Sequence, residues 1–182
     1  MVADYFSRRG MGMKFRADFS DLIKIRPITL EDFSFVLKWS KDDTFCSAND
    51  WEINRNEQEL YKWWLHCVNN LPKDFIRLGI EMENKLIGYA DLACIMDNTA
   101  ELGIAIGEST LWGKGIGFKS SMRMMDYAVA HFGITVFNAE THETNIRARK
   151  MLDRMGFEEV SRIGTEAYAG VETKLIQYNL SC

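Results

Sequence analysis

Long apolar segments are missing from this chain of 182 residues. It has no run of about 18 apolar residues, the length that a membrane-spanning helix needs, so we expect no membrane partner. An excess of basic residues is missing as well, because 22 Lys and Arg stand against 26 Asp and Glu and the net charge is −4. Since a protein that binds mainly the phosphate backbone needs the opposite balance, no nucleic-acid partner is expected.

Closely spaced cysteines are also missing. The four cysteines, Cys46, Cys67, Cys94 and Cys182, form no C-x-x-C pair, which argues against a disulfide framework and against a metal site. Reduced thiols are typical of cytoplasmic proteins, so we expect a cytoplasmic protein that holds no metal. Cys67 and Cys94 are expected in its core.

Repeats, low-complexity segments and interdomain linkers are absent, and the length fits one domain. The composition, with 47% hydrophobic and 26% charged residues, is that of a globular protein. Residues 1–20 contain several basic residues but lack the apolar segment of a secretory signal. We therefore predict a loosely ordered N-terminal extension over residues 1–20, followed by one domain over residues 21–182.

Strand and helix periodicities alternate along this domain, and a polar stretch over residues 41–50 is expected to connect the first two helices. The expected strands are 22–28, 75–81, 85–95, 101–106, 134–140, 157–163 and 173–180. The expected helices are 30–37, 56–71, 114–132 and 145–155. Short turns make the strands before residue 106 an antiparallel meander, and a β-α-β crossover follows. The pattern predicts an α+β domain, with a mixed but mostly antiparallel sheet of six to seven strands flanked by about four helices.

The segment with the clearest chemistry is 101–119, ELGIAIGESTLWGKGIGFK. A strand leads into a loop in which Gly113, Gly115 and Gly117 alternate, and a helix begins there. Glycines allow successive backbone N–H groups to point at one spot, and the helix N-terminus adds unpaired donors and its dipole. This predicts a cradle for a phosphate or pyrophosphate. The alternative is a glycine-rich turn that only caps the helix.

Two common phosphate-binding motifs fit poorly. A P-loop ends in Gly-Lys-Ser/Thr, whereas Gly117 is followed by Phe118. A dinucleotide-binding fingerprint shares Gly115-x-Gly117 and has Glu140 about 20 residues on, but Ser120 replaces its third glycine. That motif also opens its fold, while this loop follows a meander, so an NAD-binding oxidoreductase is the less favoured alternative.

The sequence WGKGIG, from Trp112 to Gly117, resembles the Gln/Arg-x-x-Gly-x-Gly/Ala motif of the GNAT superfamily of acetyl-CoA-dependent N-acetyltransferases. The sequence NIRA, which begins at Asn145 and leads to a Met-Gly-Phe ending at Phe157, is similar to the family's second cofactor motif. The resemblance extends over about Leu22 to Leu180 and implies the single-domain GNAT fold. The phrase AELGIAIGESTLWGKGIG is most similar to the branch of ribosomal-protein N-terminal and polyamine acetyltransferases.

The resemblance implies that acetyl-CoA is the co-substrate and that an amine takes its acetyl group directly, without an acyl-enzyme. Backbone amides from Gly113 to Phe118 would hold the pyrophosphate, strand 104–106 would pair with the pantetheine arm, and Asn145 would contact the arm or the thioester. The implied cofactor-binding residues are Ile104, Ala105, Ile106, Trp112, Gly113, Lys114, Gly115, Ile116, Gly117, Phe118 and Asn145. A homodimer is an expectation that rests on this branch alone.

The catalytic groups are less defined by the sequence. Many family members protonate the leaving thiolate with a Tyr seven residues after the helix Asn, whereas this chain has Leu152 there. Ala148 also replaces a Ser that is frequent in this branch. Direct transfer needs a deprotonated amine, a polarised carbonyl and a proton for the leaving sulfur. The missing Tyr keeps open a catalytically silent module that binds or senses acyl-CoA.

Four residues are candidates for these proton transfers. Glu101 begins the central strand and could act as a base directly or through water. Glu140 ends the strand expected over residues 134–140 and His142 follows it. Tyr168, in the loop before the last strand, is a candidate donor near the thioester. Each residue has a simpler interpretation as a surface side chain.

The acceptor is left open between a protein N-terminus, a polyamine and a small amine. Asp50, Glu52 and Glu57 cluster around Trp51 between the first two helices, and such a cluster would suit a cationic amine. The alternative is a solvated acidic face.

Overall fold

An eight-stranded sheet runs through residues 22–182, the part of the chain that the computed structural model describes. The predicted extension over residues 1–20 lies outside these described residues. The sheet has the order β1-β2-β3-β4-β5-β8-β6, and β7 pairs with β8 off this path. The strands are β1 (Ile23–Pro27), β2 (Ile76–Met82), β3 (Lys85–Met96), β4 (Thr99–Ile106), β5 (Val136–His142), β6 (Glu158–Ser161), β7 (Thr165–Tyr168) and β8 (Val171–Ser181).

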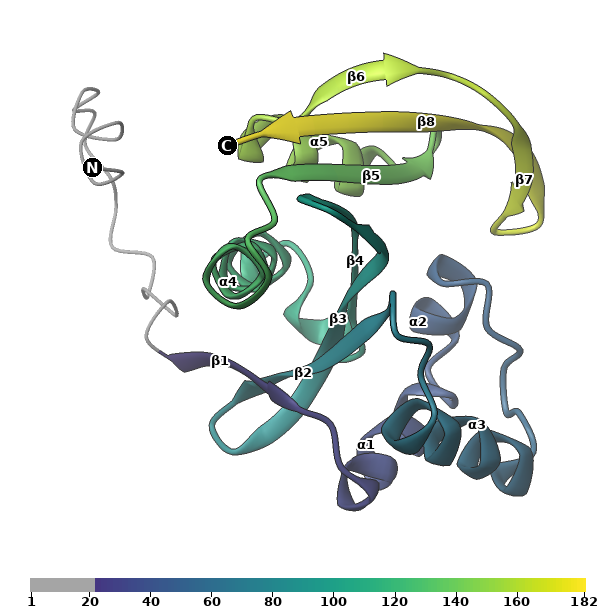
Figure 1. Ribbon diagram of the computed structural model, residues 1–182. Coiled ribbons are helices and arrows are strands. Elements are labelled where there is room, and N and C mark those ends of the chain that lie inside the picture. The colour runs from purple at the N-terminus through teal and green to yellow at the C-terminus, as the bar shows by residue number, and fades with distance from the viewer. Residues whose placement is uncertain (1–21) are drawn as a thin grey trace, which may run out of the picture.

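Five α-helices accompany the sheet in this part of the chain (Figure 1). They are α1 (Phe33–Trp39), α2 (Asp43–Ala48), α3 (Glu57–Asn69), α4 (Ile116–Phe132) and α5 (Ile146–Met155). The predicted α+β fold with one mixed sheet is confirmed. The structure has one strand and one helix more than the upper numbers that the sequence predicts.

The additional helix, α2, lies in the stretch over residues 41–50 that we expected to be a polar connection. Asp42 caps it, because its Oδ1 accepts hydrogen bonds from the backbone nitrogens of Thr44 at 2.9 Å and Phe45 at 3.2 Å. The helix buries Phe45 and Cys46. Two adjacent apolar residues do not make a helical period, so the stretch reads as a loop.

The additional strand, β7, forms a hairpin with β8 through a turn at Ala169 and Gly170. Both turn residues have positive φ, 50° and 77°, as the tight turns of β-hairpins require. Tyr168 is therefore the last residue of a strand, and its predicted place in a loop is wrong.

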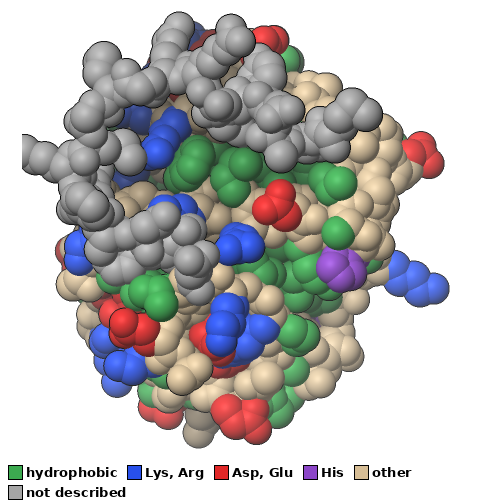
Figure 2. All heavy atoms as spheres, turned by 90° about the vertical axis from the view of Figure 1, so that its left-hand side faces the viewer, with side chains coloured by type: hydrophobic (Ala, Val, Ile, Leu, Met, Phe, Trp, Pro, Cys, Tyr) green, Lys and Arg blue, Asp and Glu red, His purple; other side chains and the backbone are tan. Residues whose placement is uncertain are grey.

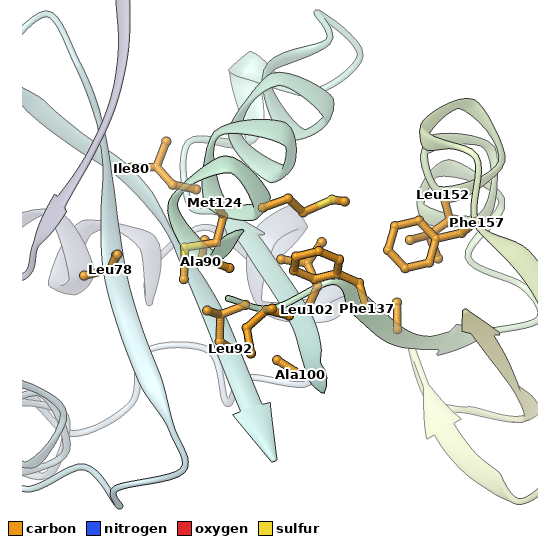
Figure 3. Packing of buried hydrophobic residues seen from close by; sticks show 14 of the residues in the cluster. Leu78, Ile80, Ala90, Leu92, Ala100, Leu102, Met124, Phe137, Leu152 and Phe157 are labelled. Carbon is orange, nitrogen blue, oxygen red and sulfur yellow. The ribbon is translucent and has the colours of Figure 1, made fainter. Parts of the chain in front are cut away.

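Two hydrophobic clusters lie on opposite faces of the sheet. The first packs strand residues against α4 and α5, and Figure 3 shows Met124 beside Ala90 and Leu92, with Leu152 beside Phe157. The second packs the other face against α1, α2 and α3. Of the two cysteines expected in the core, Cys67 is buried, but Cys94 is exposed, with φ of 50° beside a register shift in β3.

Trp39 fixes the layer of α1, α2 and α3 against the end of β4. It is 1% exposed, and a Cβ added to Gly107 would lie 2.1 Å from its ring. A side chain at Gly107 would therefore collide with the indole. This close approach brings the end of α2 beside the loop that follows β4.

The sheet opens between β4 and β5, the one parallel pair in the described chain. Their pairing joins Thr99–Glu101 to Val136–Asn138 and stops there. The strands then diverge (Figure 1), and β5 continues to pair with β8 as far as His142. The rest of β4, Leu102–Ile106, therefore has no strand partner on the side of the opening.

The described surface is mixed in charge on one face. Figure 2 shows acidic, basic and hydrophobic side chains interspersed over its visible part. Among the described residues, no helix is both long and apolar enough to cross a membrane.

Candidate functional site

A cavity of about 440 Å³ lies where β4 leads through the glycine loop into α4. One wall comes from the end of β4 and the loop, another from α5, and Ala48 and Asn49 at the end of α2 close a third side. Every residue that the resemblance implied for the cofactor lines this cavity except Lys114, which is exposed. The structure thus brings two segments 30 residues apart in the sequence to one site.

The glycine loop depends on two glycines for its backbone conformation. Gly113 and Gly115 have φ of 76° and 81°, a conformation that L side chains rarely adopt, and an added Cβ would meet no atom within 4 Å at either position. Helix α4 begins after Gly115, with no side-chain cap on its N-terminus. The first-turn N–H groups of this 17-residue helix are therefore available to an anion.

Gly117 is important for helix packing. A Cβ at this position would lie 3.2 Å from Sδ of Met151 on α5, which is closer than ordinary van der Waals contact. The third glycine of the motif therefore allows α4 and α5 to approach each other beside the cavity.

The α5 wall is basic. Arg147, Lys150 and Arg154 line the cavity, and none of the three pairs with a carboxylate of the described chain. The Arg147 guanidinium lies 3.8 Å from the Trp112 ring centroid, and that of Arg154 lies 4.2 Å from the ring of Phe118. Burial lowers the pKa of Arg147, but a guanidinium stays charged in proteins. The wall opposite the glycine loop therefore carries unpaired positive charge.

These three cations are not among the cofactor-binding residues predicted from the sequence. Their spacing, i, i+3 and i+7, places them on one helix face, and that signal was present in the sequence. What the sequence did not indicate was that this face meets the glycine loop.

Asn145 caps α5 at the edge of the cavity. Its Oδ1 accepts a hydrogen bond from the backbone nitrogen of Ala148 at 3.1 Å. No described residue accepts from its Nδ2, which leaves this donor for a ligand. Trp112 is fixed in turn, since its Nε1 donates to the carbonyl of Ile106 at 2.8 Å.

Glu101 and Glu140 lie close together on β4 and β5. Partial burial and, secondly, the Glu140 carboxylate raise the pKa of Glu101. Glu140 accepts a hydrogen bond from Nε2 of Gln177 at 2.6 Å. Glu140 lies within β5, as the strand expected over residues 134–140 implies. The pair provides a carboxylate that binds its proton more readily than an ordinary glutamate.

His142 and Tyr168 form a second pair, with ring centroids 4.6 Å apart and the rings 24° from parallel. His142 is the last residue of β5 rather than a residue beyond it, and its buried Nδ1 has no hydrogen-bond partner in the described chain. Tyr168 is near enough to Arg147 to oppose the fall in that residue's pKa. Glu101, His142 and Tyr168 all lie outside the cavity wall itself.

The structure divides the predicted acidic cluster around Trp51. Asp50 and Trp51 line a second cavity together with Asp43. Glu57 lines a separate depression beside Tyr61. Leu152, at the position of the family's frequent Tyr, is 5% exposed and packs in the first hydrophobic cluster.

The mixed sheet opens beside the glycine loop and the uncapped N-terminus of α4. The chain belongs to the acetyltransferase (GNAT) domain family, whose model matches residues 23–158. This match confirms the superfamily inferred from the glycine loop.

Two related proteins show the range of the family. An uncharacterized protein of Methanocaldococcus jannaschii is 28% identical over 144 residues, which are 77% of this chain and 29% of that protein. The human alpha/beta-tubulin-N-acetyltransferase 9 is 31% identical over 139 residues, 74% of this chain and 58% of that enzyme. The matched part of this chain thus spans less than two thirds of either relative.

A solved structure has the same fold. The spermidine N-acetyltransferase of Vibrio cholerae, in complex with CoA and spermine, superimposes with a TM-score of 0.75. The superposition covers 88% of this chain and 96% of that one, at 19% identity. It establishes the fold of the described domain.

Proposed function

We propose that this domain is an N-acetyltransferase that moves the acetyl group of acetyl-CoA to a primary amine. The observation that carries the proposal is the cavity in which an uncapped helix N-terminus faces unpaired cations, because CoA bears several phosphate charges. The names of the tubulin and spermidine enzymes support an amine acceptor. The candidates are a protein N-terminus, a polyamine and a small amine.

The proposal gives the described residues roles toward two parts of acetyl-CoA, the pyrophosphate and the pantetheine arm. The loop and first-turn amides from Gly113 to Phe118 would hold the pyrophosphate, with Arg147 and Lys150 opposite. The unpaired edge of β4 offers backbone groups to the amides of the pantetheine arm. Bound there, the co-substrate supplies an activated acetyl thioester.

Glu101 is the proposed base. The neutral amine nitrogen forms a C–N bond to the acetyl carbon, and the C–S bond breaks with its electron pair on sulfur. Glu101 takes the proton lost by the nitrogen, directly or through water, and its raised pKa favours that role. The sulfur takes a proton from Tyr168, His142 or water, so the products are an amide and a free thiol.

Calorimetric titration with acetyl-CoA, with NADH as the control ligand, is the first test. We expect acetyl-CoA to bind and NADH not to bind. In Gly115→Asp, a carboxylate beside the helix N-terminus would repel the pyrophosphate, and we expect acetyl-CoA binding to be lost. Gly133→Asp is the matched control, because Gly133 has a similar φ of 65° but lies at the far end of α4.

Release of free thiol in the presence of amines separates an enzyme from a silent acyl-CoA-binding module. The module has one observation in its favour, the buried Leu152 at the position of the frequent Tyr. Binding without amine-dependent thiol release would establish the module and contradict the enzyme. Unchanged affinity in Gly115→Asp would contradict the cradle itself.

A further inference from the structure

A row of polar side chains crosses one face of the sheet from its outer strand toward β4. Ser161 on β6 lies opposite Gln177 on β8, and Gln177 lies opposite Glu140 on β5. Opposite residues of antiparallel strands point to the same face. Glu101 on β4 pairs in register with Asn138, which lies two residues before Glu140 and therefore on the same face of β5. The row thus leads across three strands to the proposed base.

The side-chain amide of Gln177 makes four hydrogen bonds. Its Oε1 accepts from Oγ of Ser161 at 2.7 Å and from the backbone nitrogen of Ile163 at 2.9 Å. Its Nε2 donates to the carbonyl of Ile163 at 2.8 Å and to Oε2 of Glu140 at 2.6 Å. Because a backbone nitrogen only donates and a carbonyl only accepts, a flipped amide would lose both contacts with Ile163. The nitrogen of the amide is therefore fixed toward Glu140.

This contact restrains a carboxylate that is otherwise open to water. Glu140 is exposed, and an exposed glutamate side chain has several staggered rotamers available. The bond from Gln177 is short and charge-assisted, which makes it stronger than a hydrogen bond between neutral groups. It selects the rotamers in which the carboxylate stays over the sheet.

Glu140 is the neighbouring charge that acts on Glu101. Partial burial raises the pKa of Glu101, and the Glu140 carboxylate raises it further. On the other side of β4, Asp91 of β3 lies on the same face, but Arg77 of β2 binds both its oxygens at 2.7 Å and 2.8 Å, so this pair is neutral as a whole. His142 lies beyond Glu140 on β5. A Glu140 side chain that turned into water would lower the pKa of Glu101.

We infer that Gln177 is a positioning residue, which holds the Glu140 carboxylate beside Glu101 through an amide fixed on the backbone of Ile163. This inference rests on the proposed function, in which Glu101 is the base. Gln177 carries no charge of its own, so it acts on Glu101 only through Glu140. Without it, the carboxylate of Glu140 moves into solvent, its charge is screened, and Glu101 ionises at a lower pH.

The test is an NMR titration of the Glu101 carboxyl group in the full chain labelled with ¹³C-glutamate, with Glu101→Gln used to assign the signal. Gln177→Met keeps the length of the side chain and removes its hydrogen bonds. We expect the pKa of Glu101 to fall in this variant, in the same direction as in Glu140→Gln. Adding Gln177→Met to Glu140→Gln should cause no further fall. Gln177→Asn, one methylene shorter, should also lower this pKa and replaces the Met variant if that one does not fold.

Asn179→Leu is the matched control. Asn179 lies two residues from Gln177 on the same face of β8, and its Nδ2 donates to Oδ1 of Asn138 at 2.9 Å. Asn138 is the register partner of Glu101, so the control removes a cross-strand hydrogen bond next to the proposed base without touching a carboxylate. We expect the pKa of Glu101 to be unchanged in this variant.

The outcomes separate this inference from the function on which it rests. An unchanged pKa of Glu101 in Gln177→Met, an equal fall in Asn179→Leu, or a further fall in the double variant overturns the inference, and none of these readings needs turnover. The acid limb of the kcat/KM profile should move to lower pH together with the pKa. A limb that stays while the pKa falls overturns both Glu101 as the base and the role of Gln177 in the reaction. Absence of amine-dependent thiol release from the parent chain contradicts the proposed function.

Discussion

Glu101 and Glu140 lie on adjacent strands, and the charge of Glu140 affects the pKa of Glu101. Partial burial and the neighbouring carboxylate both favour the neutral form of Glu101, so its pKa lies above that of an ordinary glutamate. A base must be ionised to accept a proton. The activity should therefore fall on the acid side at a higher pH than an ordinary glutamate would give.

Glu140→Gln removes the negative charge beside Glu101 and keeps a side chain of the same size that can still accept a hydrogen bond from Gln177. We expect the pKa of Glu101 to fall, so that the acid limb of the kcat/KM profile moves to lower pH. The profile is measured with saturating acetyl-CoA and a fixed amine, and Glu158→Gln, an exposed carboxylate on β6, is the control. An acid limb that stays in place would mean that a group other than Glu101 titrates.

Among single residues, the glycines of the first cavity could be assigned to the site from the sequence, whereas the cations around them could not. Gly113 and Gly115 could be predicted because their function depends on local backbone conformation. Arg147, Lys150 and Arg154 could not be assigned, because their role depends on which side of α5 faces the loop.

Helix α2 is the element that joins the two cavities. Its cap residue, Asp42, accepts hydrogen bonds from Thr44 and Phe45 through Oδ1, and its Oδ2 accepts one from the hydroxyl of Ser109 at 2.5 Å. Ser109 lies shortly before the glycine loop. The cap therefore fixes a short helix and ties it to the segment that leads into α4.

Asp42→Ala should lower the free energy of unfolding by about 1–2 kcal/mol, the usual cost of losing an N-cap. Urea denaturation measures this change. Asp42→Asn keeps a good cap and should retain most of the stability. A loss as large in the Asn variant would mean that the charge, rather than the cap, stabilises this segment.

Long periodic elements could be predicted from the sequence, and short ones could not. Helices α3, α4 and α5 have apolar residues at helical spacing over at least two turns. Helix α2 has six residues and β7 has four, too few to establish a period. Both are stabilised by tertiary partners, the second hydrophobic cluster for α2 and strand β8 for β7.

On the scale of the whole molecule, the domain consists of two half-sheets joined at one short seam. Strands β4 and β5 pair only at Thr99–Glu101 and Val136–Asn138. The first cavity takes its loop wall from one half and its α5 wall from the other. The width of this opening depends on how both halves pack, which no local pattern in the sequence encodes.

A ligand that contacts both walls should stabilise the entire domain. At acetyl-CoA concentrations near 100 times the Kd, we expect a gain of about 2.7 kcal/mol and a rise in Tm of roughly 5–10 °C. Thermal unfolding followed by circular dichroism measures the shift, and Gly115→Asp should show none. An equal shift in that variant would place the ligand elsewhere.

The stacking of Arg147 on Trp112 has an optical consequence. Trp112 is one of five tryptophans, and the other four belong to the layer of α1, α2 and α3 and the loop between α2 and α3. Trp112 alone lines the first cavity, with a guanidinium over its ring. Indole emission responds to nearby charge and polarity, so the domain carries its own fluorescent reporter of ligand entry. Replacing Trp112 with Phe would remove this ligand-dependent change in fluorescence and leave the emission of the other four tryptophans.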